Sequence, residues 1–184
     1  MNRLKKVFIA VILTLLLLSG SSLYMDKESV YVQGVDKEYV YVQGVDNGYV
    51  YVQGVTGKLY ETGIRVTEDN QLLEHYVFKD IAIGVAVWAS NITIRWCVFI
   101  NCSDEGIVFF STSQFNKVEN CLFVYCCDGI ELQQSHNTTI SNCTFNHSWH
   151  AGIDIIGKPS HNASIISCNF ADNEMDIYRR AVDN

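Results

Sequence analysis

One short pattern recurs four times in the second half of this chain: an aliphatic residue, then a cysteine, then a phenylalanine. The copies are I-R-W-C-V-F at 94–99, V-E-N-C-L-F at 118–123, I-S-N-C-T-F at 140–145 and I-I-S-C-N-F at 165–170. Their spacing is 24, 22 and 25 residues. A period of this size is typical of proteins built from stacked structural repeats, so it constrains the fold more than any other feature.

Each repeat has the same internal order. It opens with an asparagine, continues with the pattern above, and reaches a glycine–isoleucine pair after a polar bend. The asparagines are Asn91, Asn116, Asn137 and Asn162, and the pairs begin at Gly106, Gly129 and Gly152. Alternating Val, Ile, Thr, Phe and Cys indicate strands rather than helices. About 22 residues are too many for one strand, so we expect two or three short strands per repeat, stacked about 4.8 Å apart in an all-β solenoid.

The repeat resembles that of right-handed parallel β-helix proteins. It has the form I-x-x-[NC]-x-F followed by G-I-x-[IL], and the segment I-R-V-T-E-D-N-Q-L-L-E-H-Y-V-F at 64–78 is similar to a first coil. The pattern looks most like the secreted NosD-type and pectate-lyase-like families, and it is similar to the carbohydrate-binding and sugar-hydrolase repeat domain. The resemblance covers residues 64–180. It implies that residues 61–184 form a short right-handed parallel β-helix of about five coils.

The resemblance says less about function, because this architecture hosts lyases, hydrolases, adhesins and accessory proteins. The ladder position that is often Asn in relatives is Cys in this chain. There is also no long inserted loop of the kind that builds a deep substrate cleft in polysaccharide lyases. The resemblance therefore carries no catalytic residue over to this chain.

A second repeat, ten residues long, precedes the first. V-Y-V-Q-G-V begins at Val30, Val40 and Val50. Alternating Tyr and Val predict strands, and Asn-Gly at 47–48 predicts a tight hairpin turn. We expect residues 24–60 to form a three-stranded meander of these units.

The first 23 residues have the layout of a secretory signal peptide: a basic start, an apolar run over 7–18, and small residues over 19–22. The alternative is an uncleaved N-terminal anchor, although the run is short for a membrane span of about 20 residues. Either way we expect an extracytoplasmic protein, secreted or held at the cell surface.

The chain carries 20 Asp and Glu against 13 Lys and Arg, a net charge of −7 at pH 7. Removal of the basic leader would make the remainder more acidic. This balance argues against nucleic acid as a partner. We expect a polysaccharide or envelope component as the ligand, with self-association or a protein partner as further possibilities.

Two carboxylates, Glu131 and Asp154, follow the glycine–isoleucine pairs of successive repeats. In a solenoid they would stand one coil apart on an outer sheet face, where mutual repulsion raises one pKa. Glu131, Asp154 and His150 are therefore the candidate catalytic residues of a glycan-cleaving site. Asp128, Glu131 and Asp154 are the candidate metal ligands, with Ca²⁺ as the ion; no cofactor is otherwise required. The alternative is a set of solvated surface charges.

The histidines suggest a weaker alternative, a Zn²⁺ or Cu²⁺ site. His136 and His161 occupy equivalent places in two repeats, and His147 and His150 share one bend. Neither pair supplies a closed ligand set, and stacked polar residues at coil corners usually satisfy backbone groups.

Seven cysteines are present, and equivalent ones should stack at a disulfide-compatible spacing. The candidate pairs are Cys97–Cys121, Cys143–Cys168 and Cys102–Cys126. The alternative, slightly favoured because stacked neighbours point the same way, is a ladder of buried thiols. Six Asn-x-Ser/Thr sequons permit glycosylation, but Asn and Thr are also common at bends. The sequons start at Asn91, Asn101, Asn137, Asn142, Asn146 and Asn162.

Three functions remain open. The first is a non-catalytic protein that binds carbohydrate or envelope components along its solenoid face. The second is a polysaccharide lyase or glycoside hydrolase that uses the Glu131–Asp154 pair. The third is a structural protein that associates with itself through the decapeptide strands.

Overall fold

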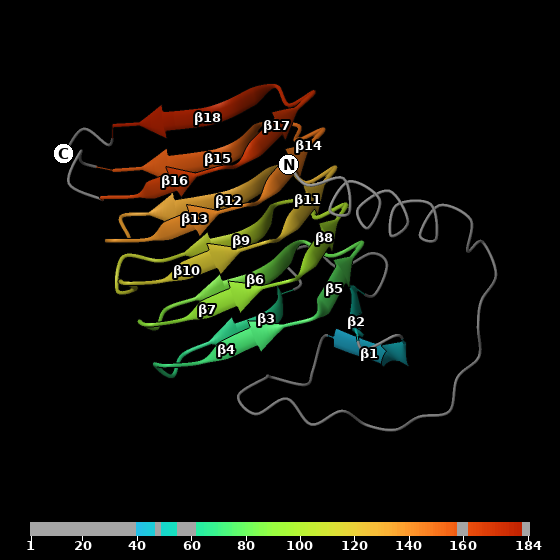
Figure 1. The fold of residues 1–184 in the computed structure, drawn as a ribbon. Coiled ribbons are helices and arrows are strands. Elements are labelled where there is room, and N and C mark those ends of the chain that lie inside the picture. Colours follow the sequence, from blue (N-terminus) through green and yellow to red (C-terminus); the bar gives the residue numbers. More distant parts are fainter. Residues whose placement is uncertain (1–39, 47–48, 55–61, 158–161, 182–184) are drawn as a thin grey trace.

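The computed structural model describes residues 40–46, 49–54, 62–157 and 162–181. The leader, the first decapeptide and His161 lie outside these residues. The described part is all β and forms three sheets (Figure 1). No helix in this part is long and apolar enough to cross a membrane.

The three sheets run along the solenoid, and each takes one strand from every coil. Sheet A contains β1 (Val40–Asp46), β2 (Tyr49–Gly54), β5 (Tyr76–Lys79), β8 (Val98–Ile100), β11 (Leu122–Val124), β14 (Thr144–Asn146) and β17 (Asn169–Ala171). Sheet B contains β3 (Thr62–Val66), β6 (Ile83–Val87), β9 (Glu105–Phe109), β12 (Asp128–Gln133), β15 (Ala151–Ile156) and β18 (Met175–Arg180). Sheet C contains β4 (Leu72–Glu74), β7 (Thr93–Arg95), β10 (Lys117–Glu119), β13 (Thr139–Ser141) and β16 (Ser164–Ile166).

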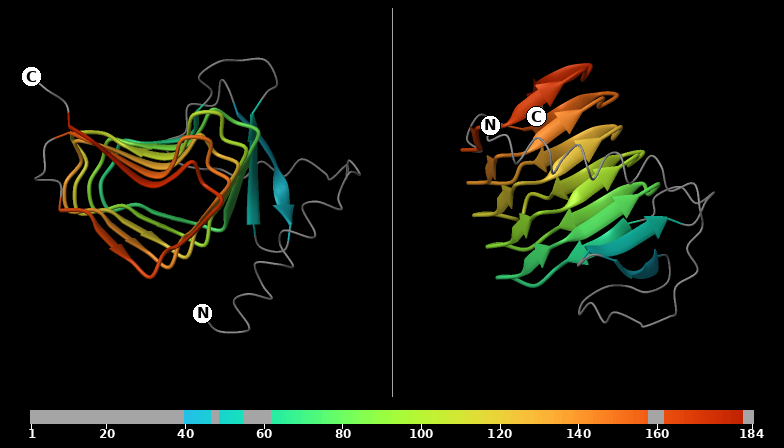
Figure 2. Two further views of the ribbon diagram at one scale, coloured as in Figure 1. Left: turned by 90° about the horizontal axis from the view of Figure 1, so that it is seen from above. Right: turned by 45° about the vertical axis from the view of Figure 1, so that its right-hand side comes forward.

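The chain visits the sheets in the order A, B, C and repeats, which gives a β-solenoid of about five turns (Figure 2). All pairings between coils are parallel among the described strands, apart from the β1–β2 pair. Val118 pairs with both Ile94 and Ile140, and Phe123 pairs with both Phe99 and Phe145. The predicted all-β solenoid and its stacked columns are therefore confirmed.

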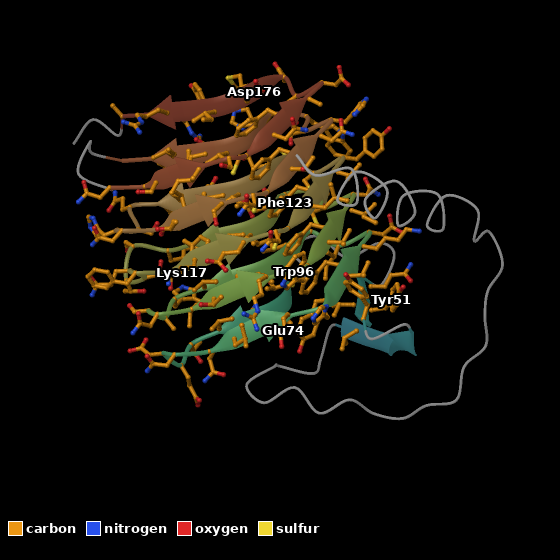
Figure 3. The ribbon with its side chains drawn as sticks, viewed as in Figure 1. Tyr51, Glu74, Trp96, Lys117, Phe123 and Asp176 are labelled. Atoms are coloured by element: carbon orange, nitrogen blue, oxygen red, sulfur yellow. The ribbon has the colours of Figure 1, made fainter. Side chains whose placement is uncertain are left out.

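A ladder of phenylalanines fills the interior beside sheet A. Neighbouring rings stack with centroids 4.7 to 5.1 Å apart. The rings belong to Phe78, Phe99, Phe123, Phe145 and Phe170. A column of glycines on sheet B lies directly against this ladder: a Cβ on Gly106 would be 2.6 Å from the carbonyl oxygen of Gly129 and 2.7 Å from the Phe123 ring. The repeated glycine is needed because two backbones and a ring approach closely there. Figure 3 shows the side chains, with Phe123 labelled among them.

The chain turns between sheets through residues in the left-handed conformation, with φ mostly near 55°. Three columns of such residues run along the solenoid, one at each corner, and most members are Asn, Asp or His, which tolerate this conformation better than other side chains. Five of the six sequon asparagines occupy these corners: Asn91, Asn101, Asn137, Asn142 and Asn162. Backbone geometry thus accounts for most of the sequons.

One predicted alignment is wrong. Asn116 does not share the corner column of Asn91 and Asn137; Phe115 does, with φ of 56°. Asn116 is instead fully buried, and its Oδ1 accepts the backbone N–H of Ile92 at 2.8 Å. Asparagine suits both places, because its side chain can cap a buried backbone donor as well as tolerate a left-handed corner.

Two of the three decapeptide units are described. β1 and β2 pair in antiparallel fashion, with Asp46 opposite Tyr49 as expected for strands joined by the Asn47-Gly48 pair. β2 then pairs with β5 in parallel fashion, so these units extend sheet A of the β-helix itself. The strand predicted for the first unit lies outside the described residues.

Candidate functional site on the outer face of sheet B

The outer face of sheet B carries most of the chemistry-bearing residues. In the end-on view its strands bend toward the interior of the coil (Figure 2, left). Ile130 and Leu132 of β12 point into the core, and Glu131 between them points out. Glu131 lies opposite Asp154 of β15, which in turn lies opposite Tyr178 of β18. The predicted pairing of Glu131 with Asp154 on adjacent coils is thus present.

These carboxylates are not the solvated surface charges of the alternative interpretation. Glu131 is 5% exposed and Asp154 is fully buried. Two further carboxyl groups on the same face, Glu105 and Asp128, are opposite each other in the register and are also buried. We call Glu105, Asp128, Glu131 and Asp154 the acidic cluster.

Arg180 of β18 links two members of the acidic cluster. Its Nη2 forms an ion pair with Oδ2 of Asp154, and it lies 3.5 Å from Oε2 of Glu131. Its Nε donates to Oδ1 of Asp154 at 3.4 Å. The hydrogen bond with Asp154 raises the pKa of Arg180. The other oxygen of Glu131 accepts a hydrogen bond from Nε2 of Gln133. One cation and one amide therefore hold these two carboxylates in fixed positions.

Asp128 orients His150. Nδ1 of His150 lies 2.8 Å from Oδ1 of Asp128, and the same oxygen accepts the backbone N–H of Ala151 at 2.9 Å. The His150 ring packs edge-on against Tyr178, with centroids 5.3 Å apart. Burial raises the pKa of Asp128, and the contact with His150 partly opposes that rise. The contact with Asp128 therefore fixes the orientation of the His150 ring.

Burial raises the pKa of several carboxyl groups in the acidic cluster. Burial, together with the nearby carboxylates Asp104 and Glu131, raises the pKa of Glu105 to about 9. Burial also raises the pKa of Glu131; Gln133 opposes this rise and Asp154 adds to it. A carboxyl group with a raised pKa is suited to act as a proton donor in acid–base chemistry.

Three residues could hold a metal ion. Asp128, His150 and Asp154 each offer an atom within 4.8 Å of the others. This set combines nitrogen and oxygen ligands, which suits Zn²⁺ better than the predicted Ca²⁺. However, Arg180 already pairs with Asp154. A metal ion would have to compete with that guanidinium, so Ca²⁺ at Asp128, Glu131 and Asp154 stays a prediction.

An aromatic pair lies on the same face. Trp88 and Phe110 directly follow β6 and β9, in the column that continues with Gln133, Ile156 and Arg180. Their rings stack with centroids 4.5 Å apart and planes 8° apart. Trp88 is 37% exposed, so the stack presents part of its surface to solvent.

The sequence did not reveal several of these residues. Phe110 has no aromatic counterpart in the later repeats, and Arg180 lies 26 residues after Asp154 in a different column. The sequence did contain a signal for Glu105. Glu105-Gly106 and Asp128-Gly129 both place a carboxylate before the glycine that recurs in each repeat. His147, by contrast, contacts Asn146 at 2.6 Å and the ring of Tyr125, at a different corner from the acidic cluster.

The cysteines form ladders of free thiols. Cys97, Cys121 and Cys143 are buried, and each Sγ lies 3.3 to 3.4 Å from the carbonyl oxygen two residues earlier. Cys102 and Cys126 form a separate buried pair. Cys127 lies near the acidic cluster, and burial together with Asp128 raises its pKa to about 11. A thiol in that environment is a poor nucleophile, and the three disulfide pairs stay predictions.

A comparison with protein families agrees with this architecture. The family model described as "Right handed beta helix region" matches residues 20–178. No curated protein matches the chain. Since the family model covers most of the sequence and the structure is a parallel β-solenoid of about five turns, the chain belongs to the right-handed β-helix family.

Proposed function

We propose that this protein acts outside the cytoplasm and binds a polysaccharide on the outer face of sheet B. The observation that carries the proposal is the exposed Trp88–Phe110 stack on the same face as the acidic cluster. Aromatic rings pack against the apolar faces of sugar rings, and carboxylates, amides and guanidinium groups bind sugar hydroxyls. The expected signal peptide supports contact with an envelope or extracellular glycan.

The ligand has to be an oligosaccharide rather than a single sugar. Glu105 begins β9 and Phe110 follows its end, so the two are five residues apart on one strand. At about 3.3 Å per residue this is about 16 Å. A ligand that contacts both ends of the face must extend across the whole width of sheet B.

The test is binding to a panel of neutral and charged polysaccharides by affinity electrophoresis, with two tryptophan variants. Trp88→Ala should reduce the affinity about tenfold or more, a loss of about 1.4 kcal/mol. Trp96→Ala is the matched control, because Trp96 is 39% exposed and lies between β7 of sheet C and β8 of sheet A, away from sheet B. Absence of binding to every polysaccharide, or equal losses in the two variants, would overturn the proposal.

A second function, cleavage of glycosidic bonds, is favoured by one specific observation. Glu131, whose pKa is raised by burial, lies opposite Asp154, which is ion-paired with Arg180. Glu131 would protonate the leaving oxygen, and Asp154 would act as base or nucleophile. His150, held by Asp128, could carry protons to and from the pair.

Release of new reducing ends from the same polysaccharide panel over a day tests this second function. Glu131→Gln and Asp154→Asn should each abolish release while binding persists. If no substrate yields ends, cleavage is refuted and the binding proposal is unaffected.

A further inference from the structure

We propose that the outer face of sheet A is an interaction surface, and that in the chain that still carries its leader this face is covered by the leader's own apolar segment, residues 7–18. That segment lies outside the described residues. The surface is distinct from the proposed glycan site on sheet B, so the inference does not depend on the proposed function. Its consequence is that removal of the leader uncovers an apolar face on the folded protein.

A second hydrophobic cluster lies on the outside of sheet A. Side chains alternate between the two faces of a strand, and Phe99 and Phe123 point into the interior. The residues on either side of each phenylalanine therefore point out, and they form a cluster separate from the main core. We call this cluster the sheet A patch; its members are Val77, Val98, Ile100, Leu122 and Val124.

The outside of sheet C has a different character in the same part of the solenoid. Ile94, Val118 and Ile140 point into the core from the middle of β7, β10 and β13. The residues beside them point out and are all polar: Thr93, Arg95, Lys117, Glu119, Thr139 and Ser141. Polar outward residues are what a sheet face in contact with water requires, so the apolar patch on sheet A calls for a partner.

The sheet A patch is covered. Val98, Leu122 and Val124 point outward, yet they are only 4%, 7% and 6% exposed. Among the described residues, Tyr49 and Tyr51 of β2 pack against the patch. β2 is three strand spacings from β11, about 14 Å, which is too far for a tyrosine side chain to reach. The burial of Leu122 and Val124 therefore points to an apolar group from outside the described part of the chain.

The sequence indicates which segment this is. Five segments lie outside the described residues: 1–39, 47–48, 55–61, 158–161 and 182–184. Three of them have four residues or fewer, and 55–61 directly joins β2 to β3 at the start of the solenoid. The first segment contains the apolar run 7–18, in which Thr14 is the only polar residue. The rest of that segment is less suitable, because Asp-Lys-Glu occurs twice between Tyr24 and Tyr39.

The length and charge of the leader also fit this position. Residues 19–39 join the apolar run to β1, which belongs to sheet A itself. Fully extended, this connection spans about 70 Å, several times the length of the patch. Arg3, Lys5 and Lys6 precede the run, whereas the chain as a whole has a net charge of −7, so attraction favours docking of the basic end.

The size of the patch favours a short segment over a second copy of the protein. The patch ends at β14, where Thr144 lies next to Leu122 and Asn146 lies next to Val124. Five apolar side chains on three strands can be covered by one segment of about a dozen residues. A stable interface between two copies usually needs about 800 Å² of surface from each partner, which is more than such a patch supplies.

The experiment is photo-crosslinking of the purified full chain, with p-benzoylphenylalanine in place of Ile100, a half-buried member of the patch. We expect crosslinks to peptides from residues 7–18. The same photoreactive residue in place of Ser141 is the matched control, because Ser141 points out from sheet C and is also half-buried. Chains with light and heavy nitrogen isotopes are mixed before irradiation, which distinguishes a crosslink within one chain from a crosslink between two copies.

Two leader variants test the contact from the other side. Ile12→Asp combined with Leu16→Asp should abolish the crosslink, because burial of unpaired charges against an apolar patch is costly. The same variant should increase the fluorescence of anilinonaphthalene sulfonate, a dye that binds exposed apolar surface. Ser19→Asp combined with Ser21→Asp adds the same charges just beyond the apolar run and should change neither signal.

Three outcomes would overturn the inference. Position 100 could crosslink to a second copy, or to another segment of the same chain, or with no higher yield than the control at Ser141. None of these outcomes affects the glycan-binding proposal, which is tested by Trp88→Ala and Trp96→Ala.

Discussion

Gly106 lies directly against Phe123: a Cβ at this position would be 2.7 Å from the ring and 2.6 Å from the carbonyl oxygen of Gly129. The contact joins sheet B of one coil to sheet A of the next, and it recurs along the solenoid from Gly63 to Gly152. It explains why the glycine and the phenylalanine return together in the sequence. Either residue alone would leave a clash or a void in the interior.

Gly106→Ala should therefore destabilise the fold by about 1–3 kcal/mol, the usual cost of overpacking a core, because a methyl group must displace the Phe123 ring or the backbone. Thermal unfolding followed by circular dichroism measures the effect. Ser103→Ala is the control, since Ser103 is exposed in the turn between β8 and β9 and bonds to Ile81 through its backbone N–H. An unchanged melting temperature for Gly106→Ala would contradict the packing described above.

Phe115→Asn should stabilise the protein by about 1 kcal/mol. Phe115 is 55% exposed and has φ of 56°, a conformation that is strained for an aromatic side chain. Asn91 and Asn137 occupy the same corner in the adjacent coils. The denaturant concentration at the midpoint of unfolding measures this effect. Gln114→Asn, at the neighbouring exposed position, is the control. A lower midpoint for Phe115→Asn would show that the aromatic ring contributes more than the strain costs.

The interior of this molecule could be predicted from the repeats, because a solenoid stacks equivalent side chains of successive coils on one another. That is why Val118 could be matched to Ile94 and Ile140 from spacing alone. The outer face follows no such rule. Glu131 and Asp154 could be placed together because both follow a glycine–isoleucine pair, but Arg180 reaches them from a column in which the preceding coils have Gln133 and Ile156. A long side chain that crosses between columns leaves no periodic trace in the sequence.

Stability should fall as the pH rises from about 5 to about 9. The pKa of Glu105 is raised from 4.5 to about 9 by burial, so the folded protein binds a proton that the unfolded chain loses above pH 4.5. The stabilisation is complete below 4.5 and is lost as the pH passes the folded value. Glu105→Gln keeps a neutral side chain in place at every pH, so its unfolding free energy should be flatter over this range. If the unfolding free energies of the two proteins changed in parallel with pH, the raised pKa of Glu105 would be contradicted.

The cysteines should be protected in the folded state and all reactive after unfolding. The interior thiols are buried, and burial raises the pKa of Cys121. Titration with Ellman's reagent should therefore modify few thiols in the native protein and all seven in denaturant without reductant. If the pairs Cys97–Cys121, Cys143–Cys168 and Cys102–Cys126 are bridged, denaturant alone would expose a single thiol, at Cys127.

The last described coil should promote association between copies of the chain. Ile177 continues the core column of Ile130 and Ile153, yet it is 47% exposed because no described strand lies beyond β18. The outer edge of β18 also presents backbone groups that a second strand could pair with. We expect an apparent mass by light scattering that rises with concentration, and Ile177→Lys should hold the protein as a monomer because a charge cannot be buried in that column. Glu174→Lys changes the charge at an exposed position in the same coil and should leave association intact. A monodisperse monomer at all concentrations would show that the exposed end of the solenoid does not pair with itself.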